Sequence, residues 1–236
     1  MQLCFGDRIR PTPDADFHGA QRRDLGRGAW IESVPNWLAG HVETFDLLLA
    51  SADWQRHRRQ MYDRILEVPR CVAGMPGTEP LEWRDEETFE ILPRRGTHEE
   101  LTRSVDLLRS MAVLLGARYG RSLGHVSLNL YRDGSDSVAF HGDKLGEMRR
   151  DTIVAIVSVG DGRRFSMRPA ADPAARSSDP EAKMTRPSLT FSVGEGDLFV
   201  MGGSCQETWE HALPKMMRAG PRIAIMFREE RAFRSS

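Results

Sequence analysis

Short β-prone runs dominate the second half of the chain and constrain its fold more than any other feature. Seven of them follow one another, separated by turn signals such as Arg132-Asp133-Gly134 and Gly160-Asp161-Gly162. The runs are Val126–Tyr131, Val138–His141, Thr152–Val159, Arg164–Arg168, Leu189–Val193, Leu198–Met201 and Arg222–Phe227. Regularly spaced short strands are typical of a β-sandwich or jelly roll. The stretch 169–187, rich in Pro, Ala and Ser, is expected to be a surface loop between two strands.

The first 120 residues show a different, partly helical pattern. Apolar residues recur at helical spacing from Leu38 to Leu49 and again from Leu101 to Leu115. Thr97 and the acidic pair Glu99-Glu100 precede the second stretch and favour a helix N-terminus. Between the two, Trp54–Arg70 is basic with interleaved aromatics, which fits a nucleic-acid contact or an amphipathic helix with a solvated basic face. We therefore predict an α+β protein that is mainly β.

Composition narrows the class of protein further. The chain has 236 residues, of which 40% are hydrophobic and 28% charged, so it can bury a sizeable core. It has no run of about 18 apolar residues, and Met1–Arg10 carries charges where a signal peptide needs an apolar stretch. Three scattered cysteines, Cys4, Cys71 and Cys205, do not make a disulfide framework or a zinc–thiolate site. We expect a cytoplasmic monomer without a membrane partner.

Three residues form a candidate metal site: His141, Asp143 and His211. Two histidines and one carboxylate can occupy one face of an iron octahedron and leave the other positions open. Residues i and i+2 of a strand point to the same side, so His141 and Asp143 at a strand end could bind one ion together, with His211 from a facing strand. The pairs His41-x-Glu43 and His98-x-Glu100 lie in helical stretches, where residues two apart diverge.

The last apolar run contains two arginines that share one face. In a strand, Arg222, Ala224, Met226 and Arg228 point the same way. A guanidinium among apolar neighbours is costly to bury unless an anion pairs with it. A dicarboxylate cosubstrate would supply that anion.

Taken in order, the motifs of the second half resemble the AlkB family of Fe(II)- and 2-oxoglutarate-dependent dioxygenases. They are N-x-Y-x-x-G at residue 129, H-x-D at 141, G-D-L-x-x-M at 196, W-x-H-x-x-P at 209 and R-x-x-x-x-x-R at 222. A weaker match runs upstream through Gly28-Ala29-Trp30, Met61–Arg64 and Val68–Arg70. The resemblance implies a single domain, with a double-stranded β-helix over 120–236. An N-terminal nucleotide-recognition region over 1–119 would form the substrate lid.

Carried over by position, the resemblance implies a role for each motif residue. His141, Asp143 and His211 would bind Fe(II). Arg222 would pair with the distal carboxylate of 2-oxoglutarate, and Arg228 would lie near its keto-acid end and orient Asp143. Asn129 and Tyr131 would hydrogen-bond the cosubstrate, although a strand pair that only holds the sheet together is the alternative. With O2, the implied activity is oxidative demethylation of N-alkylated bases in DNA or RNA, which releases formaldehyde, succinate and CO2.

The sequence departs from the family where the base would bind. Founding members carry an acidic residue two positions after the iron-binding aspartate, and here that position is Leu145. Related repair enzymes often place a tyrosine after the Pro-Arg pair, where this chain offers Met75. Arg70, Met61 and Tyr62 are the other candidate substrate contacts, with Tyr62 as a possible base-flipping finger. Two alternatives stay open, namely an oxygenase of the same fold that acts on a protein or small molecule, and a catalytically silent nucleic-acid-binding module.

Overall fold

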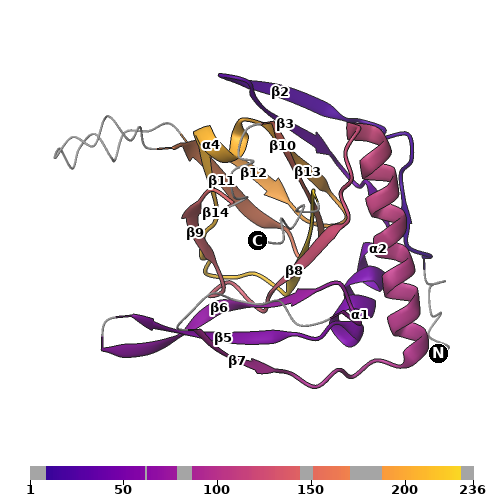
Figure 1. Ribbon diagram of the computed structural model, residues 1–236, viewed down its shortest axis with the longest axis vertical. Helices are drawn as coiled ribbons and strands as arrows, with labels where there is room; N and C mark the ends of the chain where they lie inside the picture. Colours follow the sequence, from indigo (N-terminus) through magenta and orange to yellow (C-terminus); the bar gives the residue numbers. More distant parts are fainter. Residues whose placement is uncertain (1–8, 62, 79–86, 144–150, 171–187, 230–236) are drawn as a thin grey trace, which may run out of the picture.

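The second half of the chain folds into two facing β-sheets. The computed structural model describes residues 9–61, 63–78, 87–143, 151–170 and 188–229. One layer has the order β13-β10-β15-β8 and belongs to a nine-stranded sheet, and the other is a four-stranded sheet with the order β12-β11-β14-β9 (Figure 1). These strands are β8 (His125–Tyr131), β9 (Val138–His141), β10 (Thr152–Gly160), β11 (Arg163–Pro169), β12 (Leu189–Val193), β13 (Leu198–Gly203), β14 (Trp209–Leu213) and β15 (Arg222–Arg228). The arrangement confirms the predicted jelly roll, and β14 joins the seven runs predicted from sequence.

Strands from the first half extend both edges of the larger sheet. β3 (Ala29–Val34) pairs with β13 and carries β2 (Gln21–Gly26) outside it. At the other edge, β6 (Arg64–Gly74) pairs with β8, followed by β5 (Gln55–Met61) and β7 (Glu87–Ile91). Two short strands, β1 (Thr12–Pro13) and β4 (Leu38–Ala39), pair separately. Strands from both sides of residue 120 share this one sheet. The functional division into a recognition region over 1–119 and a core over 120–236 stays a prediction.

The basic segment Trp54–Arg70 is not a helix. β5 and β6 are antiparallel partners, with Arg56 opposite Cys71 and Met61 opposite Arg64. The helical alternative for this segment is therefore wrong. A strand forms here because β6 and β7 supply backbone hydrogen bonds on both sides of it, and these bonds do not depend on an apolar pattern in the strand.

The two helical stretches of the first half are confirmed. They form α1 (His41–Ser51) and α2 (His98–Tyr119). Thr97 and Glu100 make a capping box at the start of α2, and Gly120, with φ of 65°, ends it in the left-handed conformation. A third, one-turn helix is α4 (Cys205–Thr208), between β13 and β14. No helix in the described part of the chain is both long and apolar enough to cross a membrane.

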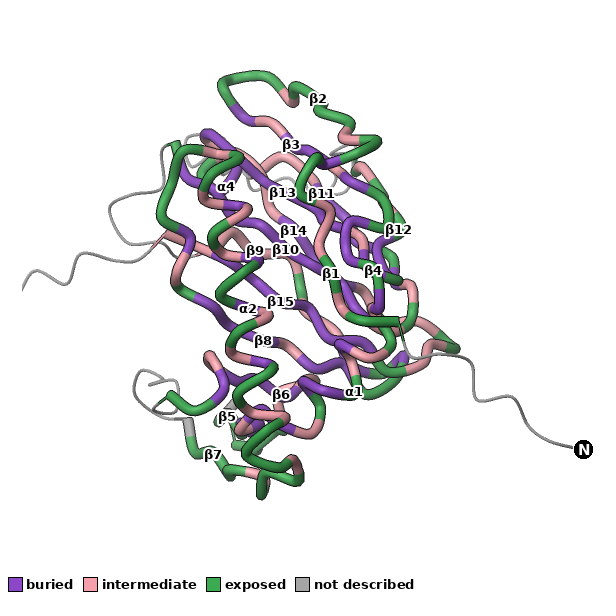
Figure 2. The backbone as a smooth tube through the Cα atoms, turned by 90° about the vertical axis from the view of Figure 1, so that its right-hand side faces the viewer, coloured by how far each residue is buried: buried purple, intermediate pink, exposed green. Residues whose placement is uncertain are grey.

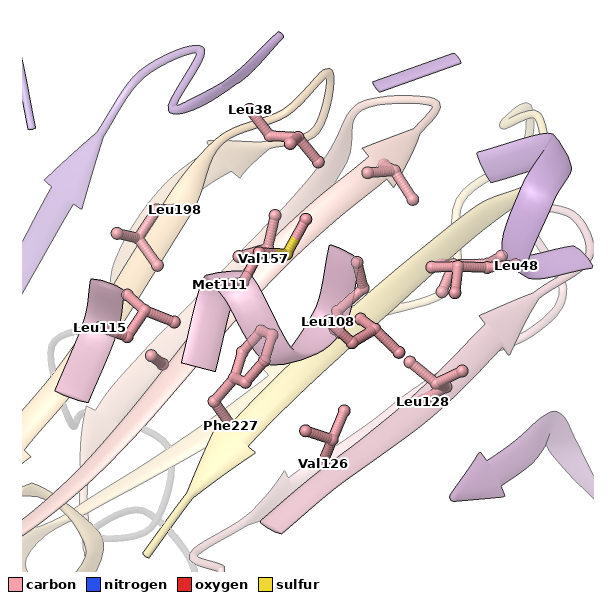
Figure 3. Close-up of a cluster of buried hydrophobic side chains, with 14 of the residues drawn as sticks. Leu38, Leu48, Leu108, Met111, Leu115, Val126, Leu128, Val157, Leu198 and Phe227 are labelled. Carbon is pink, nitrogen blue, oxygen red and sulfur yellow. The ribbon is translucent and has the colours of Figure 1, made fainter. Parts of the chain in front are cut away.

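α2 packs across the face of the nine-stranded sheet that points away from the second sheet (Figures 1 and 2). Its buried residues Leu108, Met111 and Leu115 lie against strand residues that include Val126 and Phe227 (Figure 3). All three helix residues are fully buried, so truncating Leu108 to alanine should cost about 2–5 kcal/mol. This cluster fixes the sheet from outside and leaves its inner face free for the site.

Alternation along β15 separates the two faces of the sheet. Ile223, Ile225 and Phe227 belong to the cluster under α2, whereas Ala224 and Met226 belong to a second cluster between the two sheets. Arg222 and Arg228 are in phase with Ala224 and Met226, so both arginines point between the sheets. The shared face predicted from sequence is confirmed.

Candidate metal centre

The structure brings His141, Asp143 and His211 together at one end of the space between the sheets. His141 ends β9 and lies opposite His211 of β14, while Asp143 follows two residues later. His141 Nε2 is 3.6 Å and His211 Nε2 is 3.8 Å from Asp143 Oδ1. One ligand atom from each residue lies within 4.8 Å of the others. Two imidazole nitrogens and a carboxylate oxygen at this spacing fit a first-row transition metal.

Both histidines offer Nε2 to a cation. His141 Nδ1 lies 2.8 Å from the Ala139 carbonyl oxygen, which places the ring proton on Nδ1 and leaves the Nε2 lone pair available. His211 is only 7% exposed. Burial lowers the pKa of His211 to about 4, so its ring is neutral at pH 7 and can act as a ligand.

Arg228 binds the oxygen of the Asp143 carboxylate that does not face the two histidines. Its Nε and Nη2 donate to Asp143 Oδ2 at 3.0 and 2.8 Å, and its Nη1 donates to Ser127 Oγ at 2.7 Å. Burial alone would raise the pKa of Asp143, but the charge of Arg228 and its hydrogen bonds lower that pKa well below the usual range. Oδ2 is thus occupied by Arg228, and Oδ1 faces the two histidines.

Arg222 is a buried cation with unused donors. It is 1% exposed, and its Nη2 donates to Ser158 Oγ at 2.6 Å. Its Nε and Nη1 have no hydrogen-bond partner among the described residues. Burial lowers the pKa of Arg222 to about 10, so the group is still charged at pH 7. A buried cation with two free donors requires an anion, which is what the carboxylate of a cosubstrate would provide.

Tyr131 and Asn129 share the inner face of the sheet with Arg222. Tyr131 pairs with Arg222 and Asn129 with Ala224 across β8 and β15. The Arg222 guanidinium lies 5.6 Å from the centre of the Tyr131 ring. Asn129 Nδ2 lies 3.6 Å from Met226 Sδ, a weak contact that leaves its amide able to bind a polar ligand. The donor set fits a metal with a dicarboxylate beside it.

A family model agrees with this geometry. The model of the 2OG-Fe(II) oxygenase superfamily matches residues 33–229. The chain belongs to this superfamily. This oxygenase is therefore a dioxygenase enzyme whose cofactors are Fe(II) and 2-oxoglutarate, with the His-Asp-His cluster as its candidate iron site.

Curated relatives of the oxygenase include AlkB homologues. It is 29% identical over 123 residues to human alpha-ketoglutarate-dependent dioxygenase alkB homolog 3, a match that covers 52% of this chain and 42% of the relative. It is 27% identical over 223 residues to DNA oxidative demethylase ALKBH2 of Arabidopsis thaliana, covering 87% of this chain and 68% of the relative. The match thus spans less than half the length of the human relative.

The fold also occurs among solved oxygenases. A prolyl hydroxylase from Trichoplax adhaerens, solved with a peptide fragment of hypoxia inducible factor, matches with a TM-score of 0.51 and 12% identity over 87% of each chain. At that identity the likeness concerns the fold alone.

The oxygenase has one further cluster with ligand atoms close together, but it lies on the surface. Among the described residues, Asp14, Asp16 and His18 form this second group, and His18 and Asp16 are exposed. His18 already bonds Asp14, at 3.0 Å. The pairs His41-x-Glu43 and His98-x-Glu100 lie at the starts of α1 and α2, and among the described residues neither pair belongs to a group of three close ligand atoms.

The structure describes only some of the candidate substrate residues. Tyr62 and Leu145 lie outside the described residues, as does the side chain of Met61. Arg70 is half-buried in β6 and precedes Cys71, the partner of Leu130, so its backbone lies beside that of Tyr131. Met75 packs against the cluster under α2 rather than the cluster between the sheets, so the structure does not bring it to the iron site.

Three polar residues of the site were missed by the sequence analysis. Ser158 and Ser127 bond the two arginines, and Gln206 bonds the backbone of Asp143. A lone serine within the apolar run Thr152–Val159 is a signal that could have identified Ser158. No comparable signal marks Gln206, whose contact with Asp143 depends on the fold.

Proposed function

We propose that this oxygenase removes alkyl groups oxidatively from N-alkylated bases of DNA or RNA, releasing formaldehyde, succinate and CO2. The observation that carries the proposal is the similarity to a DNA oxidative demethylase over 87% of this chain, which extends beyond the iron-binding half. The second support is the AlkB homolog 3 match. Both relatives are named for a reaction that the proposed site could perform.

In this proposal each residue of the site has one task. His141, Asp143 and His211 hold the iron, and Arg228 keeps Asp143 Oδ1 turned toward the two histidines. Arg222, whose Nε and Nη1 have no partner among the described residues, would bind the distal carboxylate of 2-oxoglutarate, and Asn129 and Tyr131 on the neighbouring strand would contact the same molecule. Iron, 2-oxoglutarate and O2 together supply the oxidation of a C–H bond. The apolar cluster between the sheets keeps water from the site.

The β5–β6 hairpin is the proposed substrate-facing element. It continues the sheet edge beside β8, which carries Asn129 and Tyr131. Arg58 and Arg64 are exposed near its end, together with the apolar residues Ile65 and Leu66. Exposed arginines beside exposed apolar side chains suit a single-stranded nucleic acid, where phosphates and unstacked bases alternate. Tyr62 remains our candidate for a side chain that replaces a flipped base.

The test measures formaldehyde and succinate after anaerobic loading with Fe(II), followed by 2-oxoglutarate and O2. Parallel reactions contain no substrate, single-stranded DNA with 1-methyladenine or 3-methylcytosine, or the matching RNA. We expect formaldehyde only with methylated nucleic acid, and none from His141→Ala. Succinate without nucleic-acid-dependent formaldehyde would show a working oxygenase that acts on a protein or small molecule. Iron binding without any succinate would favour a silent binding module.

A further inference from the structure

Gln206 touches the candidate iron site from an element that carries none of the proposed ligands. It lies in α4, the single turn between β13 and β14, and is 4% exposed. Its side chain points to the segment His141–Asp143, more than sixty residues away in sequence. Gln206 bonds none of the proposed ligand atoms directly, so the burial of its polar side chain at this place requires another explanation.

The side chain and the backbone of Gln206 both contact the segment Gly142–Asp143. The Asp143 backbone N–H donates to Gln206 Oε1 at 2.9 Å. The Gln206 carbonyl oxygen lies 2.8 Å from the position that a Cβ on Gly142 would take, so the two backbones are in direct contact there. The other end of the amide is also engaged, since Nε2 lies 3.7 Å from Met201 Sδ. The amide therefore has one orientation, with the oxygen toward Asp143.

α4 is itself anchored to the turn between β2 and β3. Ser204 Oγ donates to the Arg27 carbonyl oxygen at 2.7 Å, and Ser204 N donates to that of Gly28 at 3.2 Å. Gly203, with φ of 64°, lies so close to Gly28 that a Cβ would clash with its carbonyl oxygen. The bond from Gln206 thus ties Asp143 to a part of the sheet that is fixed independently of β9.

We propose that Gln206 is a positioning residue that fixes the backbone of Asp143 for metal binding. Among the described contacts, Arg228 holds only the carboxylate of Asp143, which leaves rotation of its peptide to be controlled by another bond. Gln206 supplies that bond. Polar partners that orient a metal ligand typically change metal affinity by about 10–100-fold when they are removed. The inference rests on the metal site of the proposed function and names a new residue in it.

The test measures the Kd for Mn(II) by electron paramagnetic resonance of the free ion, without 2-oxoglutarate. Gln206→Met keeps the length of the side chain but removes the acceptor for the Asp143 N–H, together with the weak amide donor to Met201 Sδ that Gln206→Glu also lacks. We expect its Kd to rise about 10-fold. Gln206→Glu keeps an oxygen that accepts from Asp143 N–H, and we expect affinity at or above that of the wild type. Thr208→Val is the matched control, because Thr208 Oγ1 donates to the carbonyl oxygen of Ser204, the N-cap residue of α4, and this hydrogen bond does not involve Asp143.

The outcomes separate this inference from the proposed function. Urea unfolding first establishes that each variant is folded. A folded Gln206→Met with a Kd within twofold of the wild type refutes the role of Gln206, as does a Gln206→Glu that binds as weakly as Gln206→Met. A Thr208→Val that loses affinity equally would assign the effect to α4 stability and also refute it. If the wild type binds no Mn(II), or His141→Ala binds it unchanged, the metal site itself is refuted.

Discussion

Replacing Arg222 with methionine should have opposite effects on stability and on cosubstrate binding. In the protein without metal or 2-oxoglutarate, Arg222 is a buried cation whose Nε and Nη1 have no partner among the described residues. Methionine fills similar space without a charge. We therefore expect Arg222→Met to stabilise the cofactor-free protein and to weaken its binding of 2-oxoglutarate.

The size of the effect follows from the pKa of Arg222. Burial lowers that pKa from 12.5 to about 10, which at about 1.4 kcal/mol per pH unit costs the folded protein about 3 kcal/mol at neutral pH. The hydrogen bond to Ser158 Oγ, which the variant loses, offsets about 1 kcal/mol. The free energy of unfolding should therefore rise by about 2 kcal/mol. The lost pairing with a carboxylate should raise the KM for 2-oxoglutarate at least about 30-fold, since such pairs are worth about 2–5 kcal/mol.

Arg163→Met is the matched control. Arg163 is also a buried arginine near Tyr131, but it donates to the carbonyl oxygens of Asp133, Asp136 and Pro214 at 2.9, 2.9 and 3.1 Å. Its replacement leaves three acceptors unpaired and should destabilise the protein by about 3 kcal/mol or more.

Urea unfolding followed by tryptophan fluorescence measures both variants, with and without Mn(II) and 2-oxoglutarate. Succinate release at varied 2-oxoglutarate gives the KM. An Arg222→Met protein that is less stable than the wild type and gains as much stability as the wild type from the same 2-oxoglutarate concentration would refute the assignment of Arg222 as an anion-binding residue.

Three further outcomes are expected. Arg228→Met frees Asp143 Oδ2 and should weaken Mn(II) binding about 10–100-fold in the same resonance assay, whereas unchanged affinity would remove its orienting role. Thr97→Ala breaks the capping box of α2 and should lower the free energy of urea unfolding by about 1 kcal/mol without changing metal affinity. The folded-state pKa of His211 is lowered to about 4 from 6.5, so its contribution to stability is present above pH 6.5. It should be lost as the pH falls toward 4, by up to about 3 kcal/mol. The cofactor-free His211→Gln variant should show a shallower decline, and an equal decline in both proteins would place the titration elsewhere.

The core of the fold could be predicted because its signals are local. Each β-prone run of the second half contains its own alternation, and in β15 this alternation already assigned Arg222 and Arg228 to the inner face. The capping residues of α2 are likewise adjacent to the helix they begin. The proximity of His141 and His211 was predicted through the family resemblance, because their register joins strands 70 residues apart, and no local pattern encodes that register.

The parts that sequence reasoning missed depend on contacts between distant segments. β5 has the sequence Q-R-H-R-R-Q-M, which contains no apolar alternation, and it is a strand because β6 and β7 pair with it on both sides. Gln206 reaches Asp143 only because the fold brings α4 against Gly142, and the sequence around Gln206 does not indicate this contact. Met75 was expected near the base pocket because it follows the Pro69-Arg70 pair, but it lies just after the end of β6 and packs against the cluster under α2.

Ion pairs near the base of the β5–β6 hairpin reduce the number of arginines that are available to an external anion. Arg132 donates to Asp136 Oδ2 and to Glu67 Oε1, both at 2.8 Å, and Arg56 lies 3.7 Å from the same Glu67 carboxylate. These contacts tie β6 to the turn between β8 and β9, and they neutralise two arginines that a count of charges would assign to nucleic acid. Among the arginines of the hairpin whose side chains the structure describes, Arg58 and Arg64 are exposed nearer its end and are our candidates for the proposed phosphate contacts. Since each phosphate contact releases about one counterion, the proposed nucleic-acid binding should show a salt dependence that corresponds to few contacts rather than to the full arginine content of the segment.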